Sequence, residues 1–140
     1  MKSRQAFAAA GLILALSAVA SPGLAQRRGG FPEQSGEEIY KSICQGCHMP
    51  DAMGAKGAGV YPALAGNKRL GAKVYPALVI VRGQKAMPEF GSSFSDEQVA
   101  NVVNYIRSHF GNSFADTVTP DEVKAVRPPP RPVGTVAPPG

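Results

Sequence analysis

The sequence predicts a small all-α domain with three to five short helices. Two capping boxes, Ser35–Glu38 and Ser95–Gln98, each precede apolar residues at helical spacing. The valine-rich run over residues 74–81 has the composition of a strand, but no other segment of the sequence offers a strand to pair with it. We therefore expect a short helix there, with Pro76 in its first turn and Gly83 at its end.

The first helix is expected to run from about residue 36 into residues 44–48. Its apolar face is short and consists of Ile39, Tyr40 and Ile43. Residues 49–60 are rich in glycine and show no period, so they are predicted to form a loop. Residues 61–66, "YPALAG", are predicted to form an ordered turn.

The last helix of the domain follows the second capping box. Gly111 is predicted to end it, and the apolar residues at helical spacing are Val99, Val102, Val103, Ile106 and Phe110. Residues 35–112 are therefore expected to form the domain, and residues 113–140 a C-terminal extension. Phe114 and Val123 would pack the start of this extension on the domain, and its proline-rich end is predicted to be disordered.

The N-terminus has the pattern of an export signal. Lys2 and Arg4 precede an apolar run over residues 6–20, which is shorter than the ~20 residues that span a membrane. We expect a signal peptide over residues 1–25, cleaved after Ala25 or alternatively after Ala20, and a flexible segment over residues 26–34. The mature protein is then expected in the periplasm. An uncleaved membrane anchor is the alternative that this length disfavours.

Export leaves a mildly basic chain. The 15 basic residues include Lys2 and Arg4, so 13 remain against 10 acidic residues. No basic block and no basic stripe interleaved with aromatic residues is present in the sequence, which argues against nucleic-acid binding.

The two cysteines of the chain lie in one short motif, Cys44-Gln45-Gly46-Cys47-His48. In an exported protein the pair could form a disulfide, a thiol-exchange site or half of a zinc site. A zinc site needs more ligands than this sequence offers, because His109 is the one other histidine. A thiol-exchange site would need a βαβ pattern that is not visible. The spacing instead predicts covalent attachment of one haem c through two thioethers, with His48 as an iron ligand.

A sixth iron ligand is then expected from a thioether or a second imidazole. Met87 lies 39 positions after His48 in the non-periodic segment "GQKAMPEFG", which suits a loop crossing the far face of the haem. A core methionine is the alternative interpretation. Met49 is too close to His48 to reach that face, and Met53 is a weak candidate. His109 is the rival ligand, but it lies at the expected end of a helix, where a histidine interacts with the helix dipole.

These segments together resemble the small class I cytochromes c over residues 35–112. Gly36 and Tyr40 match the family's first-helix contact positions, and Val102 and Tyr105 in "ANVVNYIR" match the last-helix positions that they cross.

Two loop segments carry the resemblance further. "YPALAG" is similar to the family's loop whose proline carbonyl accepts the proximal histidine proton, which implies that Pro62 orients His48 and that Leu64 lines the haem. "AMPEF" resembles the axial methionine segment, which implies that Met87 binds the iron. The fold implied is the small cytochrome c fold around one covalently bound haem.

A narrower resemblance, in segments such as "YPALAGN" and "VTPDEVKAVR", is to haem domains of the cytochrome subunits of bacterial periplasmic dehydrogenases, alcohol dehydrogenase among them. It implies an electron carrier, not an enzyme, that accepts electrons from a dehydrogenase and passes them to a downstream cytochrome or oxidase of the respiratory chain. Those subunits often carry three haems, whereas this chain has one CxxCH motif, which favours a single-haem relay.

Three alternatives stay open in the sequence. The first is a haem enzyme or a gas or redox sensor with an open or labile sixth iron position, and the second is a thiol-exchange or metal-binding protein. The third concerns four lysines, which either steer an acidic partner to the haem edge or only solvate the surface: Lys41, Lys56, Lys73 and Lys85.

Overall fold

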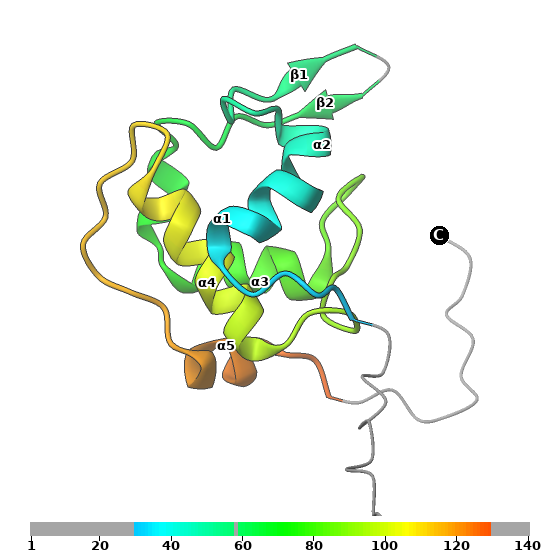
Figure 1. Ribbon diagram of the computed structural model, residues 1–140, viewed down its shortest axis with the longest axis vertical. Coiled ribbons are helices and arrows are strands. Elements are labelled where there is room, and N and C mark those ends of the chain that lie inside the picture. The colour runs from blue at the N-terminus through cyan, green and yellow to red at the C-terminus, as the bar shows by residue number, and fades with distance from the viewer. Residues whose placement is uncertain (1–29, 58, 130–140) are drawn as a thin grey trace, which may run out of the picture.

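The computed structural model describes residues 30–57 and 59–129, and its helices surround one core (Figure 1). The predicted signal peptide and the proline-rich segment from residue 130 onward lie outside the described residues. Within the described ranges, no helix combines the length and the apolar character needed to cross a membrane.

The first helical segment runs without a break through three elements: α1 (Gly36–Ile39), a π-helical turn η1 (Tyr40–Cys44) and α2 (Gln45–His48). The Ser35–Glu38 capping box is present in both directions, because the Ser35 hydroxyl accepts from the Glu38 amide and the Glu38 carboxylate accepts from the Ser35 amide. The predicted helix is therefore confirmed, with a wider turn just before the Cys-x-x-Cys-His motif.

Residues 49–60 are not loop throughout. Two short strands, β1 (Ala55–Lys56) and β2 (Val60–Tyr61), pair antiparallel, with Ala55 opposite Tyr61 and Lys56 opposite Val60. The prediction of a loop was wrong at Ala55, Lys56 and Val60, and Tyr61, predicted in the ordered turn, is also in a strand. Two-residue strands are too short to show alternation in a sequence. The domain is thus mostly helical with one small hairpin.

The predicted middle helix is confirmed. A 3₁₀ turn, η2 (Lys68–Gly71), precedes α3 (Val74–Arg82), which ends at Gly83 as expected. Its buried side chains, those of Pro76, Ala77, Ile80 and Val81, belong to the face that meets α4 and α5, and Val81 is fully buried.

The long helix α4 (Asp96–Ser108) begins with the expected capping box at Ser95. Its buried face includes the predicted residues Val99, Val102, Val103 and Ile106. The helix ends three residues before Gly111, because His109 is extended and Phe110 has a φ of 57°. His109 is exposed, with Nδ1 2.9 Å from the Tyr105 carbonyl oxygen, so it lies at the helix end, as predicted.

Helices α1 and α4 cross in close contact. A Cβ atom at Gly36 would lie 2.6 Å from the Cβ of Tyr105 and even closer to the Asn101 carbonyl oxygen. Beside this contact the rings of Tyr40 and Tyr105 lie with centroids 5.8 Å apart. The crossing that the resemblance implied is therefore present, and it depends on the missing side chain at position 36.

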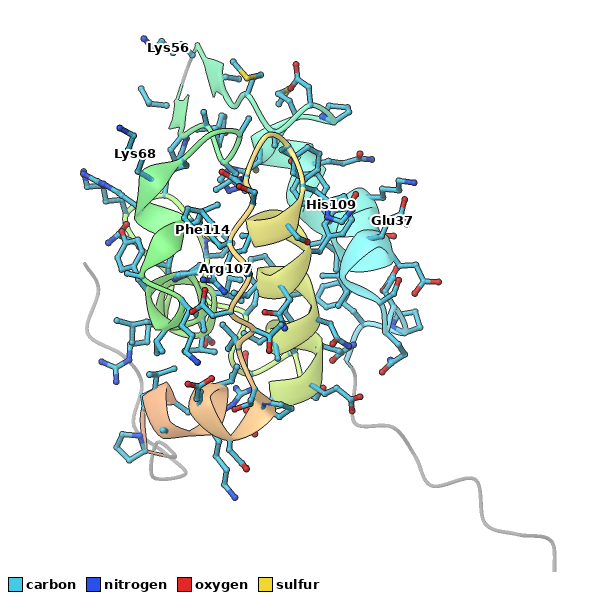
Figure 2. All side chains as sticks on the ribbon, turned by 90° about the vertical axis from the view of Figure 1, so that its left-hand side faces the viewer. Glu37, Lys56, Lys68, Arg107, His109 and Phe114 are labelled. Carbon is cyan, nitrogen blue, oxygen red and sulfur yellow. The ribbon has the colours of Figure 1, made fainter. Side chains whose placement is uncertain are left out.

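The segment after α4 folds back over the domain and ends in α5 (Pro120–Val126), which packs against α3 and α4. Val123 is fully buried and Phe114 is half-buried against the core, as their apolar character predicted. Arg107 holds this segment from inside the fold. It is 1% exposed, donates to the Leu70 carbonyl at 2.8 Å and to the Asp116 carboxylate at 2.6 Å, and stacks over Phe114 (Figure 2).

We expect Gly36→Ala to lower the free energy of unfolding by about 2–3 kcal/mol, because the added methyl group overpacks the α1–α4 crossing. Gly46→Ala is the matched control, since a Cβ atom there meets nothing within 4 Å. The control should leave stability unchanged or raise it by up to about 1 kcal/mol. Denaturant unfolding of both purified variants measures the difference, and equal midpoints would contradict the close crossing.

Candidate functional site

The Cys-x-x-Cys-His motif lies on one helical stretch at the end of η1 and on α2. Cys44 is half-buried, Cys47 is exposed and His48 is 9% exposed. The two cysteines are free thiols and do not form a disulfide with each other. The motif therefore presents two separate sulfur atoms and one imidazole within a single turn of chain.

The ring of His48 is oriented by the backbone of a distant loop. Its Nδ1 atom lies 2.9 Å from the Pro62 carbonyl oxygen, which is the contact that the resemblance implied. A carbonyl oxygen can only accept, so Nδ1 carries the proton. In this tautomer the lone pair is on Nε2, the nitrogen that can bind a metal.

Backbone contacts place Pro62 beside His48. The Ala52 carbonyl accepts from the Leu64 amide at 2.8 Å and from the Ala65 amide at 3.0 Å. Ala52 is fully buried and has a φ of 59°. Sequence reasoning missed Ala52, because it contributes a backbone carbonyl group and a left-handed backbone conformation. An alanine in a sequence indicates neither of them.

Gly54 closes the same loop from the other side. Its amide donates to the His48 carbonyl at 3.1 Å, and its φ is 67°. A Cβ atom here would lie 2.8 Å from the Pro62 carbonyl carbon and closer still to the Tyr61 carbonyl oxygen. The loop can therefore return to His48 only if residue 54 has no side chain.

Leu64 is half-buried against the core, where the resemblance puts a residue that lines the cofactor. The buried side chain of Asn112 fixes this position by donating to the Leu64 carbonyl at 2.9 Å and to the Ile106 carbonyl at 2.8 Å. Asn112 was not singled out from the sequence, since a lone asparagine after a helix gives no signal for a contact 48 residues away.

Met87 lies on the loop between α3 and α4, residues 83–95, which we call the Met87 loop. Among the described methionines it is the one that packs against the core, whereas Met53 is 62% exposed. Gln84 and Met87 exchange two backbone hydrogen bonds of 3.0 Å, which fold the loop at this residue. Figure 1 shows this loop on the same side of α1 as α2 and the hairpin.

The donor set fits a covalently attached haem better than the other chemistries that the motif allows. Burial raises the pKa of the Cys44 thiol to about 12, whereas thiol exchange needs a readily formed thiolate. In the described part of the chain no group of three His, Cys, Asp or Glu side chains is arranged to hold a metal ion. Two unpaired thiols next to an imidazole with a fixed tautomer match the needs of two thioethers and one axial nitrogen.

The four predicted lysines do not form a uniform ring of unpaired charges. Lys41 pairs with Glu37 at 2.6 Å, and Lys73 pairs with Glu122 at 2.7 Å. Lys56 and Lys85 are exposed. Two of the four charges are therefore already compensated within the protein, which weakens the steering interpretation.

Residues 32–106 match the protein family described as "Cytochrome C oxidase, cbb3-type, subunit III". The chain is 37% identical over 107 residues to the fructose dehydrogenase cytochrome subunit of Gluconobacter japonicus, covering 66% of this chain and 22% of that protein. It is 30% identical over 119 residues to the cytochrome c subunit of the quinone alcohol dehydrogenase of Gluconobacter oxydans (strain 621H), covering 76% and 24%.

A smaller relative is cytochrome c6 of Gracilaria tenuistipitata var. liui, 31% identical over 87 residues that cover 57% of this chain and 75% of that protein. The chain spans about a quarter of the length of the dehydrogenase cytochrome subunits that it matches. The proteins named here are thus a small cytochrome and two cytochrome subunits of dehydrogenases.

We expect Gly54→Ala to detach the Pro62 carbonyl from His48, because a side chain at this left-handed position collides with residues 61 and 62. The free energy of unfolding should fall by about 3 kcal/mol, and the Nδ1 proton of His48 should exchange with solvent faster in nuclear magnetic resonance spectra. Gly57→Ala, where a Cβ atom meets nothing within 4 Å, should change neither quantity. A slowly exchanging Nδ1 proton in Gly54→Ala would disprove this role of the loop.

Proposed function

We propose that this chain, which belongs to the cytochrome c family described as "Cytochrome C oxidase, cbb3-type, subunit III", is a single-haem electron carrier with the small class I cytochrome c fold. When bound, haem c supplies a one-electron Fe(III)/Fe(II) couple. The observation that supports this function most strongly is the pair of free thiols beside His48, whose Nδ1 is held by the Pro62 carbonyl.

Six residues are assigned to the cofactor in this proposal. The sulfur atoms of Cys44 and Cys47 would form the thioethers, and Nε2 of His48 and the sulfur of Met87 would be the two iron ligands. Pro62 orients His48, and Leu64 supplies apolar surface. These assignments agree with the burial of His48 and with the packing of Leu64 and Met87 against the core.

Protein groups around the cofactor would determine how easily it is reduced. The main-chain carbonyl of Pro62 would make His48 a more basic ligand and restrict its rotation. A thioether from Met87 would favour the ferrous state relative to a second imidazole. An apolar surrounding would act in the same direction as the thioether, because it disfavours the additional positive charge of the ferric state.

The proposed donor is a dehydrogenase, and the proposed acceptor is a downstream cytochrome or oxidase of the respiratory chain. Relatives named as cytochrome subunits of fructose and alcohol dehydrogenases support the donor. The proposed location is the periplasm, which rests on the signal pattern of residues 1–25. The one CxxCH motif in this sequence favours an electron relay with a single haem over the role of a subunit that carries several haems.

The exposed side of the motif suits electron exchange by contact. Cys47 is exposed, and the neighbouring hairpin exposes Val60 (73%) and Tyr61 (38%). Apolar surface beside the cofactor would let a partner approach closely. Lys56 on the same hairpin adds a positive charge that an acidic partner would meet.

The test of this function is the absorption spectrum of Met87→Ala. Loss of the thioether should convert a low-spin iron into a high-spin or exogenously ligated one and should let carbon monoxide bind the ferrous protein rapidly. Met53→Ala, at an exposed position, is the matched control and should keep the wild-type spectrum.

Two outcomes would contradict the assignment. A high-spin wild-type protein that binds carbon monoxide rapidly would indicate the open iron position of an enzyme or gas sensor. An unchanged spectrum in Met87→Ala would show that another residue is the sixth ligand.

A further inference from the structure

We propose that Arg127, in the C-terminal extension, is a positioning residue that keeps the Met87 loop closed and so slows the release of Met87 from the iron. This inference rests on the proposed function, because it presumes that Met87 is an iron ligand. It goes beyond the family match, which ends at residue 106.

The guanidinium group of Arg127 contacts three consecutive parts of the chain after Met87. It donates to the carbonyl oxygen of Gly91, to the carbonyl oxygen of Phe94 at 2.7 Å, and to the carboxylate of Asp96 in the first turn of α4. The planar fork of an arginine can satisfy these separate acceptors at once, which a lysine cannot do. One side chain therefore fixes the C-terminal half of the Met87 loop.

Arg127 is itself anchored firmly. Its amide donates to the Lys124 carbonyl at 3.2 Å at the end of α5, whose Val123 is fully buried. Arg82 of α3 donates to the Val126 carbonyl at 3.2 Å, immediately before Arg127. The guanidinium group is therefore attached to a docked helix and not to a free tail.

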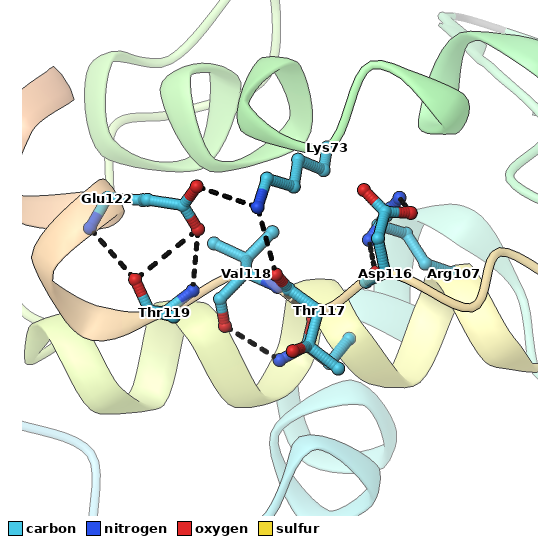
Figure 3. Close-up of polar contacts among 8 residues, drawn as sticks. Lys73, Arg107, Asp116, Thr117, Val118, Thr119 and Glu122 are labelled. Carbon is cyan, nitrogen blue, oxygen red and sulfur yellow. Dashed lines mark hydrogen bonds and ion pairs between the residues drawn. The ribbon is translucent and has the colours of Figure 1, made fainter.

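Further contacts hold the start of α5 on the domain (Figure 3). Thr119 and Glu122 form a capping box, and Glu122 also pairs with Lys73 at 2.7 Å. Lys73 donates to the Thr117 carbonyl at 3.2 Å, and Asn104 of α4 exchanges hydrogen bonds with the backbone of Val118. The extension thus connects α3, α4 and the Met87 loop.

The Met87 loop has other attachments besides Arg127. The Gln84–Met87 pair is local, and the Phe90 amide donates to the Ile80 carbonyl at 2.9 Å. Phe90 and Phe94 stack on each other with centroids 5.2 Å apart, and the ring of Phe31, from the segment before α1, packs on Phe94 with centroids 5.2 Å apart. These ring contacts are apolar, so Arg127 adds the charge-assisted hydrogen bonds that connect the later half of the loop to the end of α5.

Release of Met87 requires the loop to move away from the core, and Arg127 opposes this movement with charge-assisted hydrogen bonds at a side chain that is 23% exposed. Loss of such bonds from an ionised donor shifts an opening equilibrium by about tenfold. Helix α5 and Arg127 lie after residue 106, where the family match ends. The proposed slowing of Met87 release is therefore a property of the C-terminal extension.

The experiment measures how fast imidazole binds to the ferric, haem-loaded protein, because imidazole can enter only after Met87 leaves. Arg127→Gln should bind imidazole about tenfold faster than the wild type. Arg127→Lys should be intermediate, since it keeps the charge beside Asp96 but not the full set of donors. Lys124→Ala, an exposed position on α5, is the matched control and should match the wild type within about twofold.

A second control separates positioning from general destabilisation. Gly36→Ala weakens the α1–α4 crossing and lowers the free energy of unfolding, but it leaves Arg127 and its three acceptors unchanged. It should therefore not accelerate imidazole binding by more than about twofold. Equal acceleration in Gly36→Ala and Arg127→Gln would overturn the inference.

The outcomes distinguish this inference from the proposed function. If the wild-type ferric protein shows no thioether ligation, the assignment of Met87 fails, and the inference fails with it. If the wild type is thioether-ligated but Arg127→Gln binds imidazole at the wild-type rate, the inference alone is wrong.

Discussion

The hydrogen bond between His48 Nδ1 and the Pro62 carbonyl oxygen is the constraint on which the rest of the site depends. It fixes which ring nitrogen carries the proton, and it therefore leaves Nε2 as the nitrogen that would bind iron in the proposed site. The loop over residues 49–66 is folded to deliver this one carbonyl group. Ala52 and Gly54 adopt left-handed backbone conformations, and their main-chain atoms bond to Leu64 and His48.

The helical segment that carries the motif packs on α4 at the α1–α4 crossing, where Gly36 lets the two backbones approach and the rings of Tyr40 and Tyr105 lie beside the contact. The Met87 loop joins α3 to α4, and the C-terminal extension docks on α3, on α4 and on the loop. The proposed cofactor ligands therefore come from segments that are distant in sequence but are all attached to α4.

Short sequence motifs were enough to predict the features that depend only on residues close together in the chain. Capping boxes at Ser35 and Ser95 predicted both helix starts, and the spacing of Cys44, Cys47 and His48 predicted the cofactor class. Pro62 could be assigned only through a resemblance, since nothing in a proline reveals where its carbonyl points. The hairpin, the buried acceptor at Ala52 and the contacts of Arg127 were not predicted, because each depends on partners that only the folded chain brings together.

The central claim is that one haem is bonded covalently to Cys44 and Cys47. The most direct test is the intact mass of the denatured protein after expression in a host competent for cytochrome c maturation. The account predicts the mass of the processed polypeptide plus one haem, which stays on the chain when the fold is lost. A mass equal to the polypeptide alone, from a colourless preparation, would contradict it.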